Sequence, residues 1–493
     1  MTRDLIDNVV VIMTDQQRAD LSAREGFAVD CTPTLDRLAR AGQWFDRAYS
    51  SAPLCVPARI SMLTGRFPSA HGIRENHSYG APRRTEDLFS LARQAGFRTA
   101  MIGKNHSHLT AADVDTYLGY GHFGRQPPLT DDSLAAGHDR WLRELGARVA
   151  TEPSPYPVEA QIPSRLVDQA IDWLGPEPAD TLLWLSIPEP HVPYQLPEPY
   201  HSRYTPETVP APATDATALA GRDLSWQWIR QLGEKVGDAD PDTLARGRAS
   251  YVGMLRLIDD QVARLVTHLE QTGALDRTLI ICLADHGDFA GEYGLLRKGP
   301  GLPEVLIRIP MSFTGPGIAA AANPSTAHVS IVDVLPTVCE LLELPTPVGV
   351  QGRSLVEVLS GHEVPSEFDS SYAEQGVGGL PVTDRAVLGR LDGSTAAADG
   401  TVATLCDVTQ DGAIRMIRAG RWKLIVPVVG RPQLFDLDED PYELTDRYAT
   451  ADHAEIGRQL LEQLVRWQIR VADPLPVPDD GYPRQTHPRN YYW

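Results

Sequence analysis

The stretch from Leu54 to Arg66, LCVPARISMLTGR, places a cysteine, a proline and an arginine at the start of an expected helix. Pro57 suits a first helical turn, where its missing N–H costs nothing, so Cys55 is expected at or next to the N-cap. Helix N-termini favour negative charge, and Arg59 shares the face of Cys55. The pattern predicts an anion site at position 55; a buried free cysteine that packs as a small hydrophobe is the alternative.

Further polar clusters follow runs of apolar residues. The runs are typical of strands buried on both faces of a parallel sheet. Ligands bind at the carboxyl ends of such strands, so these clusters are candidate site residues. They are Asp15-Gln16 after NVVVIMT, Lys104-Asn105-His106 after FRTAMIG, His191 after TLLWLSI, and Asp285-His286 after RTLIICLA.

Helix-like segments separate these strands. TPTLDRLARAGQ (32–43), LFSLARQAG (88–96) and DQVARLVTHLEQTG (260–273) each have helical apolar spacing and a glycine stop. The alternation predicts an α/β fold, a large mostly parallel mixed sheet sandwiched by helices.

The composition changes after about Ser360. AIRMIRAGRWKLIVP (413–427) and RPQLFDLDED (431–440) resemble antiparallel strands. A helix is expected where Ile456, Leu460, Leu464, Trp467 and Val471 recur at helical spacing. We therefore predict two domains, 1–360 and a smaller α+β domain at 361–493.

The overall composition excludes several classes of partner. With 45 Lys and Arg against 65 Asp and Glu, the formal net charge is −20, which argues against nucleic acid and anionic membranes. Five cysteines without a CxxC pair make structural disulfides unexpected. No signal peptide or membrane span is recognisable, so a cytoplasmic location is expected. The aromatic tail, Tyr491 to Trp493, suggests self-association into a homo-oligomer.

The motif around position 55 resembles a known family signature. Cys55, Pro57, Arg59, Leu63, Thr64 and Gly65 match C-x-P-x-R-x-x-x-[LT]-T-G, the signature of the type I sulfatases of the alkaline phosphatase-like superfamily. The resemblance implies that a dedicated maturation enzyme oxidises Cys55 to formylglycine, whose hydrate is the nucleophile. It also implies hydrolysis of an aryl, carbohydrate or small alkyl sulfate ester by a sulfuric ester hydrolase.

The resemblance also implies one divalent cation. Asp15-Gln16 and Asp285-His286 resemble the two metal-ligand pairs of the family, and the residue derived from Cys55 adds an oxygen. A mostly oxygen site suits a hard cation. Calcium is the usual occupant in the family, with magnesium or manganese in some members.

Three further motifs match in the order of the family. GKNH resembles G-K-x-H, PHVPY resembles P-H-x-P-[FY], and LLRKG carries a lysine that matches a second lysine of the family. Lys104 and Lys298 would neutralise the oxygens of the bound anion, and His191 would protonate the leaving oxygen. His106 would take the proton of the second hydroxyl of the sulfated hydrate. Asn76 corresponds to a position that faces the anion in some branches.

The metal pairs depart from the commonest pattern, in which the first pair is Asp-Asp and the second Asp-Asn. Gln16 and His286 resemble instead the choline sulfatase and phosphonate monoester hydrolase branches. Hydrolysis of phosphonate monoesters or phosphodiesters is therefore the alternative reaction. A binder of sulfated ligands without catalysis is the alternative outside the enzymes.

Overall fold

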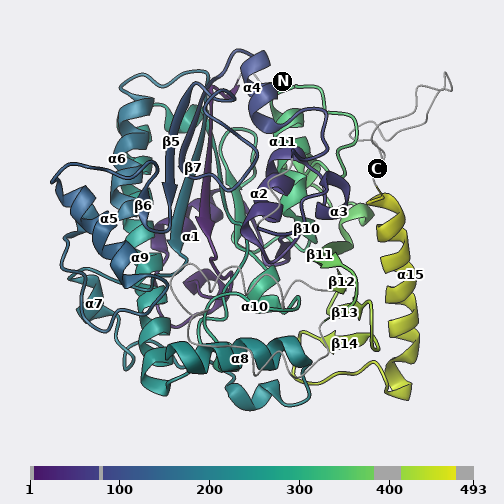
Figure 1. The fold of residues 1–493 in the computed structure, drawn as a ribbon. Helices are drawn as coiled ribbons and strands as arrows, with labels where there is room; N and C mark the ends of the chain where they lie inside the picture. The colour runs from purple at the N-terminus through teal and green to yellow at the C-terminus, as the bar shows by residue number, and fades with distance from the viewer. Residues whose placement is uncertain (1–4, 77–80, 382–411, 473–493) are drawn as a thin grey trace.

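The chain folds around one large sheet with helices on both faces and a small second sheet beside it (Figure 1). The computed structural model describes residues 5–76, 81–381 and 412–472. The second sheet and the long helix next to it come from the end of the described chain and lie to one side of the large sheet.

The large sheet has eight strands in the order β2-β9-β8-β1-β7-β4-β5-β6. Its central strands, β8, β1, β7, β4 and β5, are parallel, whereas β9, β2 and β6 pair antiparallel at the two edges. The predicted mostly parallel mixed sheet is confirmed. The strands span Asn8–Asp15 (β1), Gln43–Phe45 (β2), Arg98–Lys104 (β4), Thr116–Gly121 (β5), Gly124–Arg125 (β6), Thr181–Pro190 (β7), Thr278–Ala284 (β8) and Met311–Thr314 (β9).

Alternating residues of the central strands bury themselves against helices on opposite faces. Val9 and Val11 of β1 pack in one core with α2 (Cys55–Thr64), α4 (Leu88–Gln94) and α11 (Val334–Leu341). Val10 and Ile12 pack in the other core with α1 (Pro33–Ala41), α6 (Ile162–Leu174) and α9 (Pro241–Gln271). β1 is buried along its whole length, as a strand covered on both faces must be.

The helix predicted over 260–273 is only the end of a longer one. α9 begins at Pro241, where the Asp240 side chain accepts a hydrogen bond from Thr243 N at 3.0 Å. Proline at the first helical position and aspartate at the N-cap are typical helix starts. None of the helices within the described ranges is long and apolar enough to cross a membrane.

The second sheet is antiparallel, in the order β11-β12-β13-β14, as predicted. Its strands span Ser370–Gly378, Gly412–Ala419, Trp422–Pro427 and Gln433–Asp436, and the helix α15 spans Ala454–Arg470. Trp467 of α15 stacks on Tyr372 of β11, with ring centroids 5.8 Å apart. The domain boundary at 360 stays a prediction. The tail at Tyr491–Trp493 lies outside the described residues, as does Cys406.

Shorter elements complete the described fold. β3 (Ala48–Tyr49) and β10 (Val329–Ser330) form a separate parallel pair. The remaining helices are α3 (Pro68–His71), α5 (Leu134–Leu145), α7 (Tyr200–Arg203), α8 (Leu224–Val236), α10 (Glu304–Ile307) and α12 (Val356–Leu359). The cysteines of the described residues, Cys31, Cys55, Cys282 and Cys339, are free.

Candidate active site

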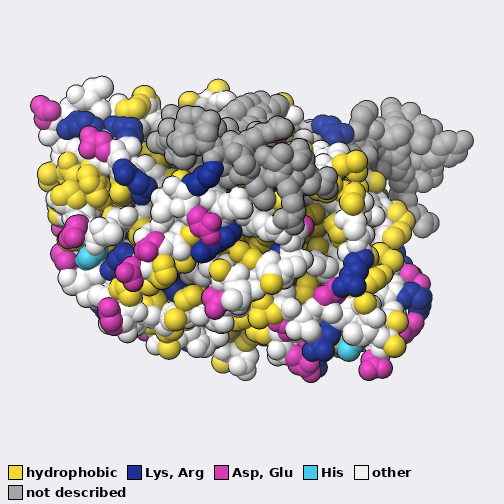
Figure 2. Space-filling model, turned by 60° about the horizontal axis from the view of Figure 1, so that its bottom comes forward, with side chains coloured by type: hydrophobic (Ala, Val, Ile, Leu, Met, Phe, Trp, Pro, Cys, Tyr) yellow, Lys and Arg dark blue, Asp and Glu magenta, His cyan; other side chains and the backbone are white. Residues whose placement is uncertain are grey.

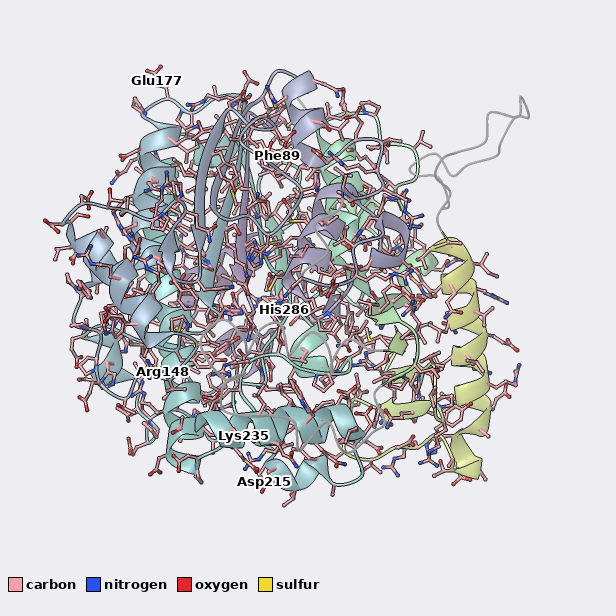
Figure 3. All side chains as sticks on the ribbon, in the orientation of Figure 1. Phe89, Arg148, Glu177, Asp215, Lys235 and His286 are labelled. Atoms are coloured by element: carbon pink, nitrogen blue, oxygen red, sulfur yellow. The ribbon has the colours of Figure 1, made fainter. Side chains whose placement is uncertain are left out.

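The predicted site residues meet where the parallel strands finish. Asp15 ends β1, Lys104 ends β4, His191 follows β7, and Asp285 and His286 follow β8. Figure 3 places His286 near the middle of the molecule. Cys55 is the first residue of α2, after the N-cap residue Leu54, so its position at the start of a helix agrees with the sequence analysis.

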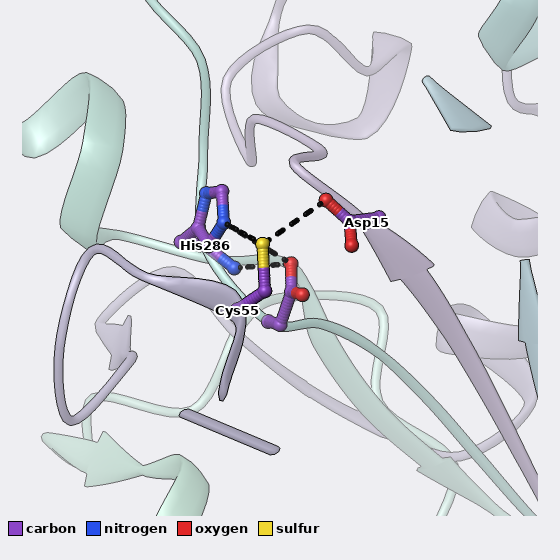
Figure 4. Close-up of side chains that lie close together, drawn as sticks. Asp15, Cys55 and His286 are labelled. Carbon is purple, nitrogen blue, oxygen red and sulfur yellow. Dashed lines mark hydrogen bonds and ion pairs between the residues drawn. The ribbon is translucent and has the colours of Figure 1, made fainter. Parts of the chain in front are cut away.

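Four buried side chains converge on one point. One ligand atom from each of Asp15, Cys55, Asp285 and His286 lies within 4.8 Å of the others. Cys55 Sγ is 3.3 Å from His286 Nε2 and 3.8 Å from Asp15 Oδ1 (Figure 4). This arrangement is a candidate metal centre.

Gln16 lies next to the same centre, where its backbone N donates to Asp285 Oδ1 at 3.0 Å. Its Nε2 donates to Asp288 Oδ2, while its Oε1 is buried without a hydrogen-bond partner. A buried acceptor without a partner is costly unless a cation or donor meets it. Two carboxylates, this amide oxygen and an imidazole therefore fit a divalent cation.

Arg59 ties the two carboxylates of the centre together. Its Nε donates to Asp285 Oδ2 at 2.8 Å, and its second terminal nitrogen donates to Asp15 Oδ2 at 2.9 Å. The sequence suggested that Arg59 reaches the group at position 55; its hydrogen bonds in the structure go to the carboxylates next to that group. The remaining nitrogen donates to Lys104 O and to Ser186 Oγ, so every arm of the guanidinium is held.

Lys104 at the end of β4 reaches Asp15 at the end of β1, although β7 lies between these two strands. Its Nζ donates to Asp15 Oδ2, and both side chains are fully buried. The preceding Gly103 has φ 119°, and a Cβ there would lie 1.9 Å from Ser186 O of β7. Only glycine fits this position, and it brings the end of β4 against β7.

Two residues of the site have strained backbones. Gln16 has φ 72° and His106 has φ 42°, both in the left-handed region. Such conformations cost about 1–3 kcal/mol each and persist where the surrounding structure holds them, often at functional sites.

Basic groups set the ionisation at position 55. Burial and Asp15 raise the pKa of the Cys55 thiol, but Lys104, Lys298 and His286 outweigh them and hold it well below its usual value. Burial would lower the pKa of Lys298, but Cys55 and Asp15 raise it above its usual value, so this amine stays charged at neutral pH. The cluster therefore favours an anion at position 55.

Acidic and basic side chains intermingle on the face of the molecule shown in Figure 2. With a formal net charge of −20, the chain as a whole does not attract anions. Attraction of an anionic ligand therefore depends on the local basic groups beside Cys55.

The remaining predicted residues, His106, His191 and Lys298, lie beside the buried metal-ligand candidates and are partly accessible to solvent. Lys298 Nζ lies 3.0 Å from Cys55 Sγ and 3.5 Å from His191 Nε2. His106 follows β4, and the partial removal of water from its ring together with the charge of Lys104 lowers its pKa to about 4, so the ring is neutral at pH 7. The side chains of His106, His191 and Lys298 retain exposed surface, whereas the metal-ligand candidates have almost none.

Asn76 lies next to the start of α2. Its Oδ1 accepts a hydrogen bond from Val56 N at 3.1 Å, one residue after Cys55. The structure therefore places Asn76 beside the candidate centre. Its neighbour His77 lies outside the described residues.

Sequence reasoning missed Ser186 and His122, and gave no role to Asp288 of the cluster after β8. Asp288 orients Gln16, and Ser186 holds Arg59. His122 follows β5 and stacks on His191. Asp288 lies three residues after Asp285 in DHGD, a visible signal, whereas β5 has no long apolar run to mark it as a strand.

The fold places the candidate metal centre at the carboxyl ends of the parallel strands. The sulfatase family model matches residues 7–344, more than half of the chain. The chain belongs to the sulfatase family, the sulfuric ester hydrolases, as its signature motif predicted.

Individual relatives agree with this assignment. The arylsulfatase of Clostridium perfringens (strain 13 / Type A) is 28% identical over 384 residues, which cover 71% of this chain and 78% of that protein. The choline-sulfatase of Rhizobium meliloti (strain 1021) is 28% identical over 464 residues, 89% of this chain and 82% of that protein. The crystal structure of the phosphonate monoester hydrolase of Agrobacterium radiobacter shares the fold, with a TM-score of 0.80 at 24% identity, over 98% of this chain and 100% of that chain.

Proposed function

We propose that this sulfatase hydrolyses a sulfate monoester of an aryl, carbohydrate or small alkyl alcohol, with Cys55 converted to formylglycine by a maturation enzyme. The observation that carries the proposal is the position of Cys55 Sγ, which lies among the metal-ligand candidates and 3.0 Å from Lys298 Nζ. A binder of sulfated ligands gains nothing from both a hydrate-forming cysteine and a proton-accepting histidine. The hydrate of formylglycine supplies the nucleophile, a role that a carboxylate or a serine has in other hydrolases.

Asp15, Gln16, Asp285 and His286 would hold one divalent cation together with the group at position 55. When bound, the cation supplies electrostatic stabilisation of negative charge on the ester oxygens. The oxygen-rich donor set favours Ca²⁺, with Mg²⁺ as an alternative. Mn²⁺ is a further alternative because His286 contributes a softer nitrogen ligand.

Each remaining residue has a distinct role in the proposal. Lys104 and Lys298 place positive charge beside position 55, where the oxygens of the ester would lie. His191 protonates the leaving oxygen. The neutral ring of His106 then takes the proton of the second hydroxyl of the sulfated hydrate, and the collapse of this hydrate expels sulfate and regenerates the aldehyde. Asn76, which contacts the start of α2, would bind the anion.

The alternative reaction is hydrolysis of phosphonate monoesters or phosphodiesters. It is favoured by Gln16 and His286, which replace the Asp and Asn of the commonest metal pairs. The sulfate group of one substrate class and the phosphorus group of the other are both tetrahedral anions of similar shape. The buried residues around position 55 would therefore suit either.

The test compares rates on 4-nitrophenyl sulfate and on phenyl phosphonate esters, with protein co-expressed with a formylglycine-generating enzyme. Faster turnover of the sulfate ester supports the proposal, and the opposite order favours the alternative. The mass of the tryptic peptide that contains position 55, from protein made in its native host, addresses the non-catalytic binder. A thiol at that position would support the binder and contradict the proposal.

Predictions about partners and location remain to be tested by experiment. We expect a small anionic ester as substrate, no nucleic-acid or membrane partner, and a homo-oligomer formed through the tail. Sedimentation at several concentrations tests the oligomer, and cell fractionation tests the cytoplasmic location.

A further inference from the structure

A third histidine lies in the wall of the active site. The ring of His122 stacks on that of His191, with centroids 3.7 Å apart and planes inclined by 18°. The edge of His106 meets His122 at 5.8 Å and 89°. The three rings therefore form a row, and His191 ends the row next to Lys298 Nζ, 3.5 Å from its Nε2.

The His191 ring is also held at its other nitrogen, Nδ1. Its Nδ1 lies 2.8 Å from Val192 O. A carbonyl oxygen only accepts hydrogen bonds, so Nδ1 carries a proton and donates it. Nε2 is then the ring nitrogen that faces the reacting groups. A single hydrogen bond still allows the ring to tilt, and the parallel stack limits that tilt.

The turn that carries His122 is held firmly in place. His122 lies in the turn between β5 and β6, and the following Gly124 has φ 103°. A Cβ at Gly124 would lie 2.0 Å from the carboxyl carbon of Asp139. That carboxylate accepts a hydrogen bond from Arg125 N and pairs with Arg165 at 2.5 Å. The turn is therefore fixed to the body of the protein, and His122 with it.

His122 also has properties that suit a stacking partner. Burial, followed by the charge of His191, holds the pKa of His122 well below its usual value. Its Nδ1 is buried without a hydrogen-bond partner. A neutral aromatic face next to a ring that becomes protonated is an attractive pair, whereas two protonated rings would repel each other.

We propose that His122 is a positioning residue, whose stacked ring holds His191 with Nε2 turned toward the leaving oxygen of the ester. The inference rests on the proposed function, in which His191 Nε2 takes a proton from the neighbouring charged Lys298 and passes it to that oxygen as the sulfur–oxygen bond breaks. Protonation matters most for alcohols that leave poorly and least for 4-nitrophenol, whose anion leaves readily. His122 then matters most for esters of ordinary alcohols.

The experiment measures kcat and KM of matured wild-type protein and of the variants His122→Ala and His122→Phe. The substrates are the sulfate esters of 4-nitrophenol, phenol and an alkyl alcohol. We expect His122→Ala to lower kcat about 10- to 100-fold on the phenyl and alkyl esters, a typical cost of a misplaced group, and much less on the 4-nitrophenyl ester. His122→Phe retains a flat ring and should remain within a few-fold of the wild type.

Two kinetic results would overturn the inference. One is an equal loss across all esters in His122→Ala, which indicates general structural damage. The other is an equal loss in His122→Phe, which indicates that a nitrogen of His122 acts in place of its ring face. The control is His453→Ala, which removes a ring that packs on Trp422 in the second sheet, with centroids 5.2 Å apart. It should leave the dependence on the leaving group unchanged.

Crystal structures of the two variants separate this inference from the proposed function. In His122→Ala the His191 ring should leave its orientation, and in His122→Phe it should keep it. An unmoved His191 in His122→Ala contradicts positioning even if the wild type is an active sulfatase. If the wild type hydrolyses no sulfate ester, the proposed function fails, while the orientation of the ring still decides the positioning role.

Discussion

Arg59 and Asp285 form an ion pair that water does not reach. Arg59 Nε lies 2.8 Å from Asp285 Oδ2, and both side chains have zero exposed surface. The same guanidinium bonds Asp15, so one residue of α2 holds a carboxylate from β1 and another from the end of β8. The spacing between two metal-ligand candidates therefore depends on a residue of the signature motif.

Arg59→Lys tests this dependence. A lysine ammonium is a compact charge and does not reproduce the planar fork that meets both carboxylates, Lys104 O and Ser186 Oγ. We expect metal affinity and kcat/KM to fall about 10- to 100-fold, the usual cost of losing a group that orients metal ligands. Titration calorimetry and steady-state kinetics measure the two effects. Wild-type affinity in this variant would show that the carboxylates hold their positions without Arg59.

Cys55→Ser removes the group that is converted to formylglycine. A serine ester has no second hydroxyl, so the enzyme has no internal route to release sulfate from it. We expect at most one turnover per protein molecule, visible as an early burst followed by a rate near background. Mass spectrometry of the protein after exposure to substrate would detect the trapped sulfate. Sustained turnover by Cys55→Ser would contradict the formylglycine mechanism.

Asp288→Asn tests the orientation of Gln16. Asp288 Oδ2 accepts from Gln16 Nε2 and, at 2.6 Å, from the Tyr194 hydroxyl. An asparagine has one carbonyl oxygen, so it does not serve these donors and Ala290 N together. We expect about 10- to 100-fold weaker metal binding, with kcat recovering at high metal concentration.

Chelation of the wild type provides the reference for that measurement. Removal of the metal should abolish activity, and separate addition of Ca²⁺, Mg²⁺ and Mn²⁺ ranks the three ions. A loss in Asp288→Asn that no metal concentration restores would place its effect outside the metal site.

The sequence predicted the components of the site better than their contacts. Asp15, Lys104 and Asp285 follow apolar runs, and strand ends of one parallel sheet must meet, so local pattern sufficed for them. His122 follows β5, whose sequence TYLGYG has no continuous apolar run. Its stacking on His191 depends on the pairing of β5 with β4, which is a long-range contact.

Helix boundaries show the same limit. The N-cap residue of α1, Thr32, makes no capping bond; Asp259 of α9 instead accepts hydrogen bonds from Thr34 N and Leu35 N. A cap supplied from more than two hundred residues away is not readable from local sequence. By contrast, the turn at Gly42 and the proline at Pro33 were readable because they act within the segment.

The contact between the second sheet and the body of the protein allows a test of stability. Lys423 of β13 is fully buried, and its Nζ lies 2.8 Å from Glu304 Oε1 of α10 and 2.8 Å from Glu443 Oε1. It also donates to Leu302 O at 2.5 Å. Without this ammonium, two buried carboxylates would face each other.

Lys423→Met should therefore lower the free energy of unfolding by about 3–5 kcal/mol, the usual cost of removing one partner of a buried ion pair. Urea unfolding measures it. The matched control is Arg458→Met on α15, which breaks pairs with the exposed Glu455 and Glu462 and should change little, because solvent screens them. Adding Glu443→Gln to Lys423→Met removes one of the opposed charges and should recover part of the loss. Equal stability of Lys423→Met and the control would show that this cluster does not hold the second sheet to the body of the protein.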